Sequence, residues 1–149
     1  MANSPALLEA YTAVSAAFDK SDLSATERQV VLLSVSYYHR CDYCIAAHSA
    51  IAGMQKVPDD VVSAIRRGES IADAKLEALR KLVIALLDRR GWLEPAERDV
   101  FLAAGYESRH VFDVLVGIAQ KTMSNFTNHI AGTPLDTMFE QFSWSPPER

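Results

Sequence analysis

The chain has 149 residues, of which 49% are hydrophobic and 23% charged, and its net charge is −4. This length and balance predict one domain, residues 1–149, with its own hydrophobic core, and they exclude a disordered chain. The 19 acidic residues outnumber the 15 basic ones. The charge excess that a nucleic-acid or anionic membrane partner requires is therefore missing, and we expect neither partner.

The sequence shows no targeting segment and no membrane span. Residues 1–9 lack a basic start followed by a long apolar stretch. The longest aliphatic run, residues 82–87, is far shorter than the roughly 18 residues that a span needs. We therefore expect a cytoplasmic protein. In that compartment, two cysteines three residues apart indicate redox or metal chemistry before a structural disulfide.

Helical periodicity runs through the whole chain, so the predicted fold is all-α. A first helix over residues 5–18 is followed by a second over residues 25–39, which starts at a capping box of Ser24 and Glu27. The second helix is apolar nearly all round, which predicts a central position. Further helices are predicted over residues 42–52, 58–67, 71–90, 95–104 and 109–126, with a short turn of helix at 135–142.

The polar residues of the C-terminal region are given structural interpretations. Asn125, Thr127 and Asn128 could contact a ligand, but a polar helix end explains them adequately, and Ser108 is interpreted as a helix cap. The tail, residues 143–149, contains two prolines and two charges, and we expect it to be loose or docked on a partner.

Cys41, Cys44 and His48 form a Cys-x-x-Cys-x-x-x-His motif at the start of the third predicted helix. At 100° per residue, all three fall within about 60° of one another on one helical face. A helix N-terminus favours a thiolate, and His48 lies one turn beyond Cys44, where it can accept or relay a proton.

The geometry alone leaves either cysteine as the nucleophile. Cys41 is nearer the helix start and is expected to be the more exposed, whereas Cys44 is nearer the base. We assign Cys44 to the attack on a peroxide or disulfide, and Cys41 to resolution of the product.

In this window the sequence resembles the AhpD-like, or carboxymuconolactone decarboxylase-like, family. The resemblance rests on Cys41-Asp-Tyr-Cys44, on His48 and on the preceding Leu23-Ser-x-x-Glu-Arg segment. It implies a single-domain AhpD-like helical bundle with the cysteine pair at the start of a central helix, assembled as a homotrimer or homohexamer. It further implies an alkyl hydroperoxide reductase or thiol–disulfide carrier without a tightly bound cofactor. The electrons would come from dihydrolipoamide or another dithiol, a lipoyl protein or a peroxiredoxin.

The chain departs from the family at one relay position. Twelve residues before the first cysteine the family has a glutamate that hydrogen-bonds the histidine, and this chain has Gln29. A glutamine can orient His48, but it neither takes up a proton at neutral pH nor stabilises an imidazolium. We therefore expect reduced peroxidase activity or a different substrate, with His39 and Tyr43 as auxiliary candidates.

Other interpretations of the motif stay open. The cysteines could be small core residues, and a zinc site is a chemical rival. Four ligands within ten residues, mostly on one helix, would surround a tetrahedral ion poorly, so no metal is predicted. The alternative functions are a non-catalytic oligomeric scaffold or redox sensor and, less favoured, a carboxymuconolactone decarboxylase-type enzyme. The candidate zinc ligands are His39, Cys41, Cys44 and His48.

Overall fold

The structure is a computed structural model that describes residue 1 and residues 3–147. In this part of the chain every regular element is helical, which confirms the predicted all-α fold. No helix among the described residues is both long and apolar enough to cross a bilayer. The elements are α1 (Pro5–Asp19), α2 (Ala25–Tyr38), α3 (Asp42–Met54), α4 (Asp59–Arg67), α5 (Ala74–Asp88), α6 (Pro95–Ala103), α7 (Ser108–Ala131) and the 3₁₀ helix η1 (Thr137–Phe142).

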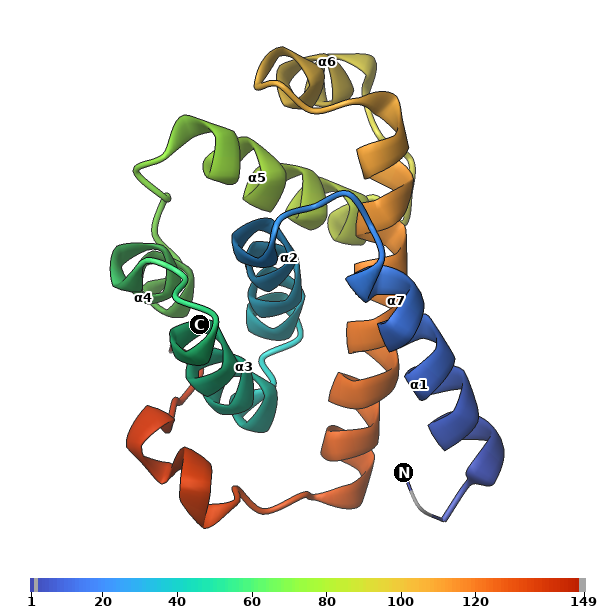
Figure 1. The fold of residues 1–149 in the computed structure, drawn as a ribbon, viewed down its shortest axis with the longest axis vertical. Helices are drawn as coiled ribbons and strands as arrows, with labels where there is room; N and C mark the ends of the chain where they lie inside the picture. The colour runs from blue at the N-terminus through green and yellow to red at the C-terminus, as the bar shows by residue number, and fades with distance from the viewer. Residues whose placement is uncertain (2, 148–149) are drawn as a thin grey trace.

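Helix α2 lies at the centre of the molecule, with α3, α4, α5 and α7 packed around it (Figure 1). It starts at the predicted capping box, in which the Glu27 N–H donates to Ser24 Oγ at 3.2 Å and the Ser24 N–H donates to Glu27 Oε2 at 2.7 Å. Burying an aliphatic side chain stabilises the fold by about 1.5–3 kcal/mol, so α2 anchors the core. Its completely buried aliphatic side chains are Val30, Val31, Leu33 and Val35.

Some helix limits differ from the prediction. Helix α3 extends to Met54, and α5 is shorter than predicted at both ends. Helix α7 continues to Ala131, where Gly132 takes a left-handed conformation with φ of 58° and ends it. Its N-cap is Glu107 rather than the predicted Ser108. The additional turn of α7 matters because it carries one side chain of the site described below.

The long helix α7 packs against α2 and lies alongside α1 (Figure 1). Gly117 is the point of closest approach. A Cβ atom there would lie 2.7 Å from Val31 Cγ1 and 2.8 Å from Phe18 Cζ, closer than packed carbon atoms tolerate. The missing side chain therefore sets how near α7 comes to the two other helices.

The C-terminal segment is fastened to α4. The Arg66 guanidinium donates to two backbone carbonyls at the start of the tail, at 3.0 and 2.9 Å. In return, Trp144 Nε1 donates to the Arg66 carbonyl at 2.8 Å, and its ring packs on Tyr37 with centroids 5.7 Å apart. The expectation of a loose tail is therefore wrong for residues 143–147, because an aromatic anchor holds it. Residues 148–149 lie outside the described part.

Candidate active site

The cysteine pair lies where α2 turns into α3. Arg40 makes this turn with φ of 58°, a left-handed conformation that is uncommon for a residue with a side chain. The Cys41 N–H closes the turn on the Ser36 carbonyl at 2.9 Å, and the Arg40 guanidinium donates to the Pro147 carbonyl at 3.0 Å. As a result Cys41 is the N-cap of α3 and Cys44 is its third residue, so the motif stands at the start of a helix as predicted.

Both thiols are buried, and the expectation that Cys41 is the more exposed is wrong. The exposed fraction is 0% for Cys41 and 3% for Cys44, because the turn holds the N-cap residue against α2. The neighbouring Cys41 thiol, acting as a donor to the Cys44 sulfur, together with Lys121 and Asn128, lowers the pKa of Cys44 to about 5 despite its burial. The same pairing raises the pKa of Cys41. Cys44 is therefore the thiolate of the pair.

Two side chains of α7 complete the surroundings of Cys44. Asn128 Nδ2 donates to Cys44 Sγ at 3.3 Å. Lys121 lies almost two turns earlier on the same helix, is 1% exposed, and stabilises the thiolate by its charge and as a hydrogen-bond donor. Both residues line the cavity into which Cys44 opens.

Sequence reasoning missed both contributions. The interpretation of Asn128 as a polar helix end is wrong, because α7 does not stop near residue 126 and position 128 stays on the helix face toward α3. A signal for Lys121 was present: it continues the inward-facing repeat that begins with Val114 and Gly117. A lysine at a core position is rare unless its charge is paired.

His48 lies one turn beyond Cys44 and is 8% exposed. Its Nδ1 is 3.0 Å from Gln29 Oε1, and the Gln29 amide in turn donates to Gln55 Oε1 at 3.1 Å. Because an amide oxygen only accepts, the proton of His48 is on Nδ1 and the lone pair is on Nε2. Burial, and secondarily the charge of Lys121, lowers the pKa of His48 well below its ordinary value, so the imidazole is neutral at neutral pH.

The auxiliary candidates stand apart from this pair. His39 is the C-cap of α2, and its Nδ1 is 3.1 Å from Asn125 Nδ2, so it is held by α7 and not by His48. The Tyr43 hydroxyl donates to Asp136 Oδ2 at 2.6 Å, and Tyr43 lines the cavity next to Cys44. His39 thus does not take the place of the family's glutamate, whereas Tyr43 borders the space available to a substrate.

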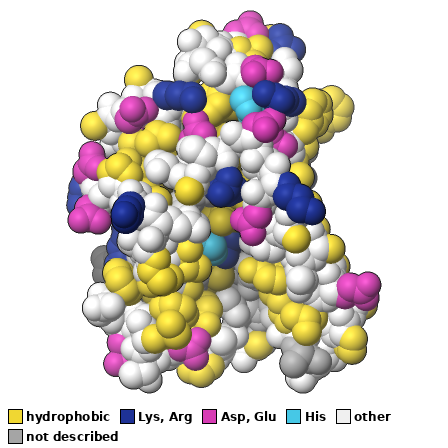
Figure 2. Space-filling model, viewed as in Figure 1, with side chains coloured by type: hydrophobic (Ala, Val, Ile, Leu, Met, Phe, Trp, Pro, Cys, Tyr) yellow, Lys and Arg dark blue, Asp and Glu magenta, His cyan; other side chains and the backbone are white. Residues whose placement is uncertain are grey.

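A cavity of about 440 Å³ opens onto Cys44 and His48 between α1, α2, α3 and α7. Figure 2 shows the hollow on this face, with α3 and η1 on one side, α1 and α7 on the other, and a histidine visible inside it. Its size suits a small substrate. Hydroxyl and amide groups form much of the remaining wall, those of Tyr11, Ser15, Gln55, Gln120 and Ser124.

The four candidate zinc ligands do not form a cluster. His39 faces Asn125 and His48 faces Gln29, so the two imidazoles are engaged with different helices. In the described part of the chain, no three side chains of His, Cys, Asp or Glu are arranged to hold a metal ion.

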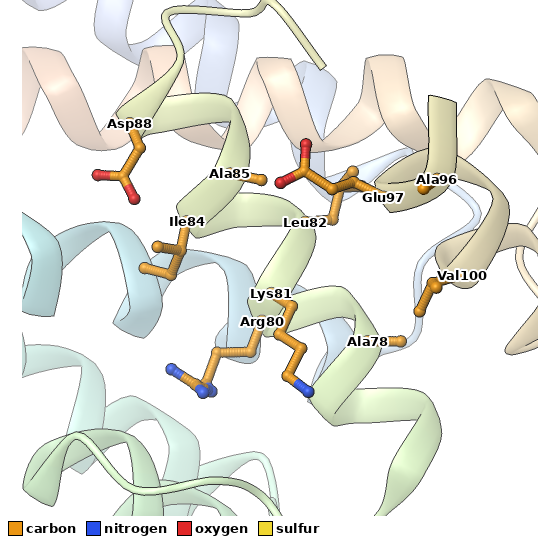
Figure 3. A pocket seen from close by; sticks show the side chains of 10 residues that line it. All are labelled: Ala78, Arg80, Lys81, Leu82, Ile84, Ala85, Asp88, Ala96, Glu97 and Val100. Carbon is orange, nitrogen blue, oxygen red and sulfur yellow. The ribbon is translucent and has the colours of Figure 1, made fainter. Parts of the chain in front are cut away.

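A second cavity, of about 490 Å³, lies between α5 and α6 (Figure 3). Its wall includes aliphatic side chains from both helices, such as Leu82 and Val100, and Arg80 on this wall is paired with Glu77 at 2.8 Å. Neither a thiol nor an imidazole is among the residues that line it. We therefore place the candidate active site at the cavity of Cys44.

The sequence model of the carboxymuconolactone decarboxylase family matches residues 5–88, which is more than half of the chain and includes the whole motif. The chain therefore belongs to this family, and the predicted resemblance is confirmed. Comparison with curated proteins gives no significant match.

Two solved structures share the fold. One is an uncharacterized peroxidase-related protein from Silicibacter sp. TM1040, with 22% identity, a TM-score of 0.78, and coverage of 91% of this chain and 73% of that one. The other is an alkylhydroperoxidase AhpD core, an uncharacterized peroxidase-related protein from Ralstonia eutropha JMP134. It has 18% identity, a TM-score of 0.83, and coverage of 93% of this chain and 75% of that one. The fold is thus that of the AhpD core.

Proposed function

We propose that the protein is a thiol-dependent peroxidase and thiol–disulfide oxidoreductase of the AhpD type, in which Cys41 and Cys44 cycle between dithiol and disulfide. The observation that carries this proposal is the pair of buried thiols at the start of α3, with Cys44 opening beside His48 onto a cavity of about 440 Å³. The similarity to structures called peroxidase-related supports the same chemistry.

The two cysteines supply both electrons of the proposed reaction, and the Cys41 thiol supplies one of its two protons; the other comes from a neighbouring acid. The Cys44 thiolate attacks the terminal oxygen of a hydroperoxide, a sulfur–oxygen bond forms, the oxygen–oxygen bond breaks, and an alcohol leaves after taking a proton. The Cys41 sulfur then attacks Cys44, and the disulfide forms as water leaves. The dithiol loses two electrons and the peroxide gains them.

His48 acts in this scheme as a neutral proton acceptor. Gln29 accepts the Nδ1 proton and so leaves Nε2 free to receive one. Without a carboxylate at position 29, the imidazolium gains no charged partner, and its formation is unfavourable in this buried site. We therefore propose a peroxidase that is slower than one with a complete glutamate–histidine relay.

The burial of both sulfurs bears on the electron donor. A disulfide of Cys41 and Cys44 would be reached only through the cavity, because neither residue exposes more than 3% of its surface. A slender dithiol such as dihydrolipoamide, free or carried on a lipoyl protein, fits this approach. A folded donor such as a peroxiredoxin would need the site to open first.

We also propose self-association, as a homotrimer or homohexamer. Helix α7 carries a row of exposed apolar side chains that fall within about 60° of one another at 100° per residue. Exposed apolar stripes of this kind are typical of subunit interfaces. The row consists of Phe112, Leu115, Phe126 and Ile130.

The test is hydroperoxide consumption with a dithiol as reductant. We expect Cys44→Ser and Cys41→Ser each to abolish turnover, and His48→Ala to slow it. Full activity in either cysteine variant would overturn the cycle. A wild-type protein that forms the disulfide but does not turn over would instead indicate a redox sensor, whose oligomeric state should then differ between oxidising and reducing conditions.

A further inference from the structure

Lys121 is unusual because it is an ionisable residue with a buried side chain. The side chain extends from α7 into the protein interior with 1% exposure, and no carboxylate of the described residues forms an ion pair with it. A buried ammonium without a counter-ion is strongly unfavourable, so a lysine in this position is either neutral or paired with an anion. Lys121 and Cys44 line the same cavity, and the sulfur of Cys44 is the negative group that raises the pKa of the ammonium.

The other titratable groups around Lys121 do not offer a competing partner. From α3, the Cys41 thiol is protonated and His48 is neutral. From the end of α2, His39 has a pKa that is lowered mainly by burial, with smaller contributions from His129 and from Lys121 itself. From α1, Asp19 lies at the cavity rim with its side chain 72% exposed and turned toward Arg28 at 3.9 Å. Tyr11 and Tyr43 also line the cavity.

We propose that Lys121 is a catalytic acid paired with Cys44: its ammonium holds the thiolate and then gives its proton to the alkoxide that leaves a hydroperoxide. This inference rests on the proposed peroxidase function and assigns the proton that the reaction needs. It is also compatible with the neutral His48–Gln29 pair, because the leaving group takes its proton from α7 and not from an imidazolium.

The proton and electron balance closes over one cycle. As Cys44 attacks, the electrons of the oxygen–oxygen bond pass to the leaving oxygen, which takes a proton from Lys121 Nζ and departs as an alcohol. Cys44 becomes a sulfenic acid and Lys121 a neutral amine. Cys41 then forms the disulfide and water leaves. When a dithiol reduces the disulfide, the Cys44 thiol returns its proton to Lys121.

The burial of Lys121 determines when its ammonium gives up the proton. Burial lowers the pKa of the Lys121 ammonium, whereas the Cys44 thiolate raises it. Once the thiolate is consumed, the raising effect disappears and the ammonium becomes a stronger acid, at the moment when the alkoxide needs a proton. The neutral amine that remains is compatible with a buried site that contains a disulfide.

The first measurement does not depend on activity. The thiolate absorbance of Cys44 is titrated with pH in Cys41→Ser, with and without Lys121→Met. We expect the methionine, similar in length but uncharged, to lower the acid ionisation constant of Cys44 by at least about tenfold. The control Lys81→Met, whose side chain is 67% exposed, should leave the constant unchanged. An unchanged constant in Lys121→Met would overturn the ion pair.

The second measurement isolates the proton transfer. The rate of Cys44 oxidation in a single turnover is divided by the measured thiolate fraction, for tert-butyl hydroperoxide and for peracetic acid. In Lys121→Met we expect the rate with tert-butyl hydroperoxide to fall at least about tenfold. The rate with peracetic acid should change less than about twofold, because acetate leaves without a proton. Equal effects on both oxidants would overturn the role as an acid.

Two further outcomes separate the proposals. Lys121→Arg keeps the charge but cannot release a proton, so it should retain the low thiolate pKa and show the slow reaction with tert-butyl hydroperoxide. If the wild-type protein reacts with neither oxidant, the peroxidase function and the acid role fail together, while the titration still decides whether Lys121 and Cys44 form an ion pair.

Discussion

The motif segment, residues 25–54, and the C-terminal half of α7, residues 117–131, build one site in different ways. The motif segment supplies the reacting sulfurs and the imidazole, all placed by the geometry of a single helix start. Helix α7 supplies Lys121 and Asn128, the latter 84 residues away from Cys44 along the chain. One region thus brings the two thiols and the imidazole, and the other brings a cation and an amide beside them.

This division follows from how each effect depends on distance. Two side chains one turn apart on a helix meet whatever the rest of the fold does. The ionisation of a buried thiol depends instead on every charge and donor packed against it, and these come from any part of the chain. The family match ends at residue 88, before α7 begins. The motif therefore lies in the part of the chain that identifies the family, and the α7 residues of the cavity lie outside it.

The largest effect should separate the two cysteines within the motif. We expect the reduced wild-type protein to form one thiolate near pH 5 and to lose it as the pH falls through that value. The second thiol should ionise only above its usual ~8.5, a difference of more than three orders of magnitude in acidity. Cys44→Ser should remove the low step and Cys41→Ser should keep it, because serine also donates a hydrogen bond. If the ionisation near pH 5 persisted in Cys44→Ser, it would belong to Cys41, and the assignment of the thiolate to Cys44 would be wrong.

The next effect should come from restoring a carboxylate within the motif segment. In Gln29→Glu, a charged acceptor faces the Nδ1 proton of His48, and the imidazolium should become about 10- to 1,000-fold easier to form. The change is measured by following the imidazole resonances with pH. Gln141→Glu, on an exposed position, is the control. If His48 titrates as in the wild type, the contact with residue 29 does not govern its protonation.

A smaller effect should come from α7 alone. Asn128→Leu removes the amide that donates to Cys44 Sγ at 3.3 Å. A hydrogen bond to a charged group contributes about 1.5–3 kcal/mol, so the thiolate should become roughly 10- to 100-fold harder to form. Thr127→Ala is the matched control, because the Thr127 hydroxyl donates to its own helix at the Met123 carbonyl. A titration of Cys44 equal to the wild type would show that α7 acts through Lys121 only.

The smallest effect should come from the tail. Trp144→Phe keeps the aromatic contact with Tyr37 but loses the hydrogen bond from Nε1 to the Arg66 carbonyl. We expect the free energy of unfolding to fall by about 0.5–1.5 kcal/mol, with no change in the acidity of Cys44. Denaturant unfolding and the thiolate titration measure the two quantities. A change in Cys44 acidity would mean that the tail belongs to the site as well.

Local patterns account for what could be predicted from the sequence. The capping box at Ser24, the apolar α2 and the Cys-x-x-Cys-x-x-x-His spacing are each decided within one or two helical turns, and the structure contains all three. The position of Gln29 beside His48 could be predicted from the resemblance to a family. The burial of Cys41 could not be predicted, because it depends on the left-handed turn at Arg40.

The contribution of α7 was beyond such patterns for a physical reason. The predicted end near residue 126 is too early, because polar residues 125, 127 and 128 resemble a helix end, whereas Gly132 is the residue that ends α7. Lys121 continues the inward-facing repeat of Val114 and Gly117, so its burial could be inferred from the sequence, but the group that it faces could not. A buried charge has meaning only through its partner, and that partner lies on another helix.

The close approach at Gly117 makes the position of Lys121 relative to Cys44 depend on helix packing. The glycine lies one turn before Lys121 and lets α7 rest directly on Val31 and Phe18. A methyl group there would push α7 outward and carry the Lys121 ammonium away from the Cys44 sulfur. The acidity of a thiol would then respond to a change in volume that touches no polar atom. The packing of α7 on α1 and α2 at Gly117 therefore helps to set the acidity of the Cys44 thiol.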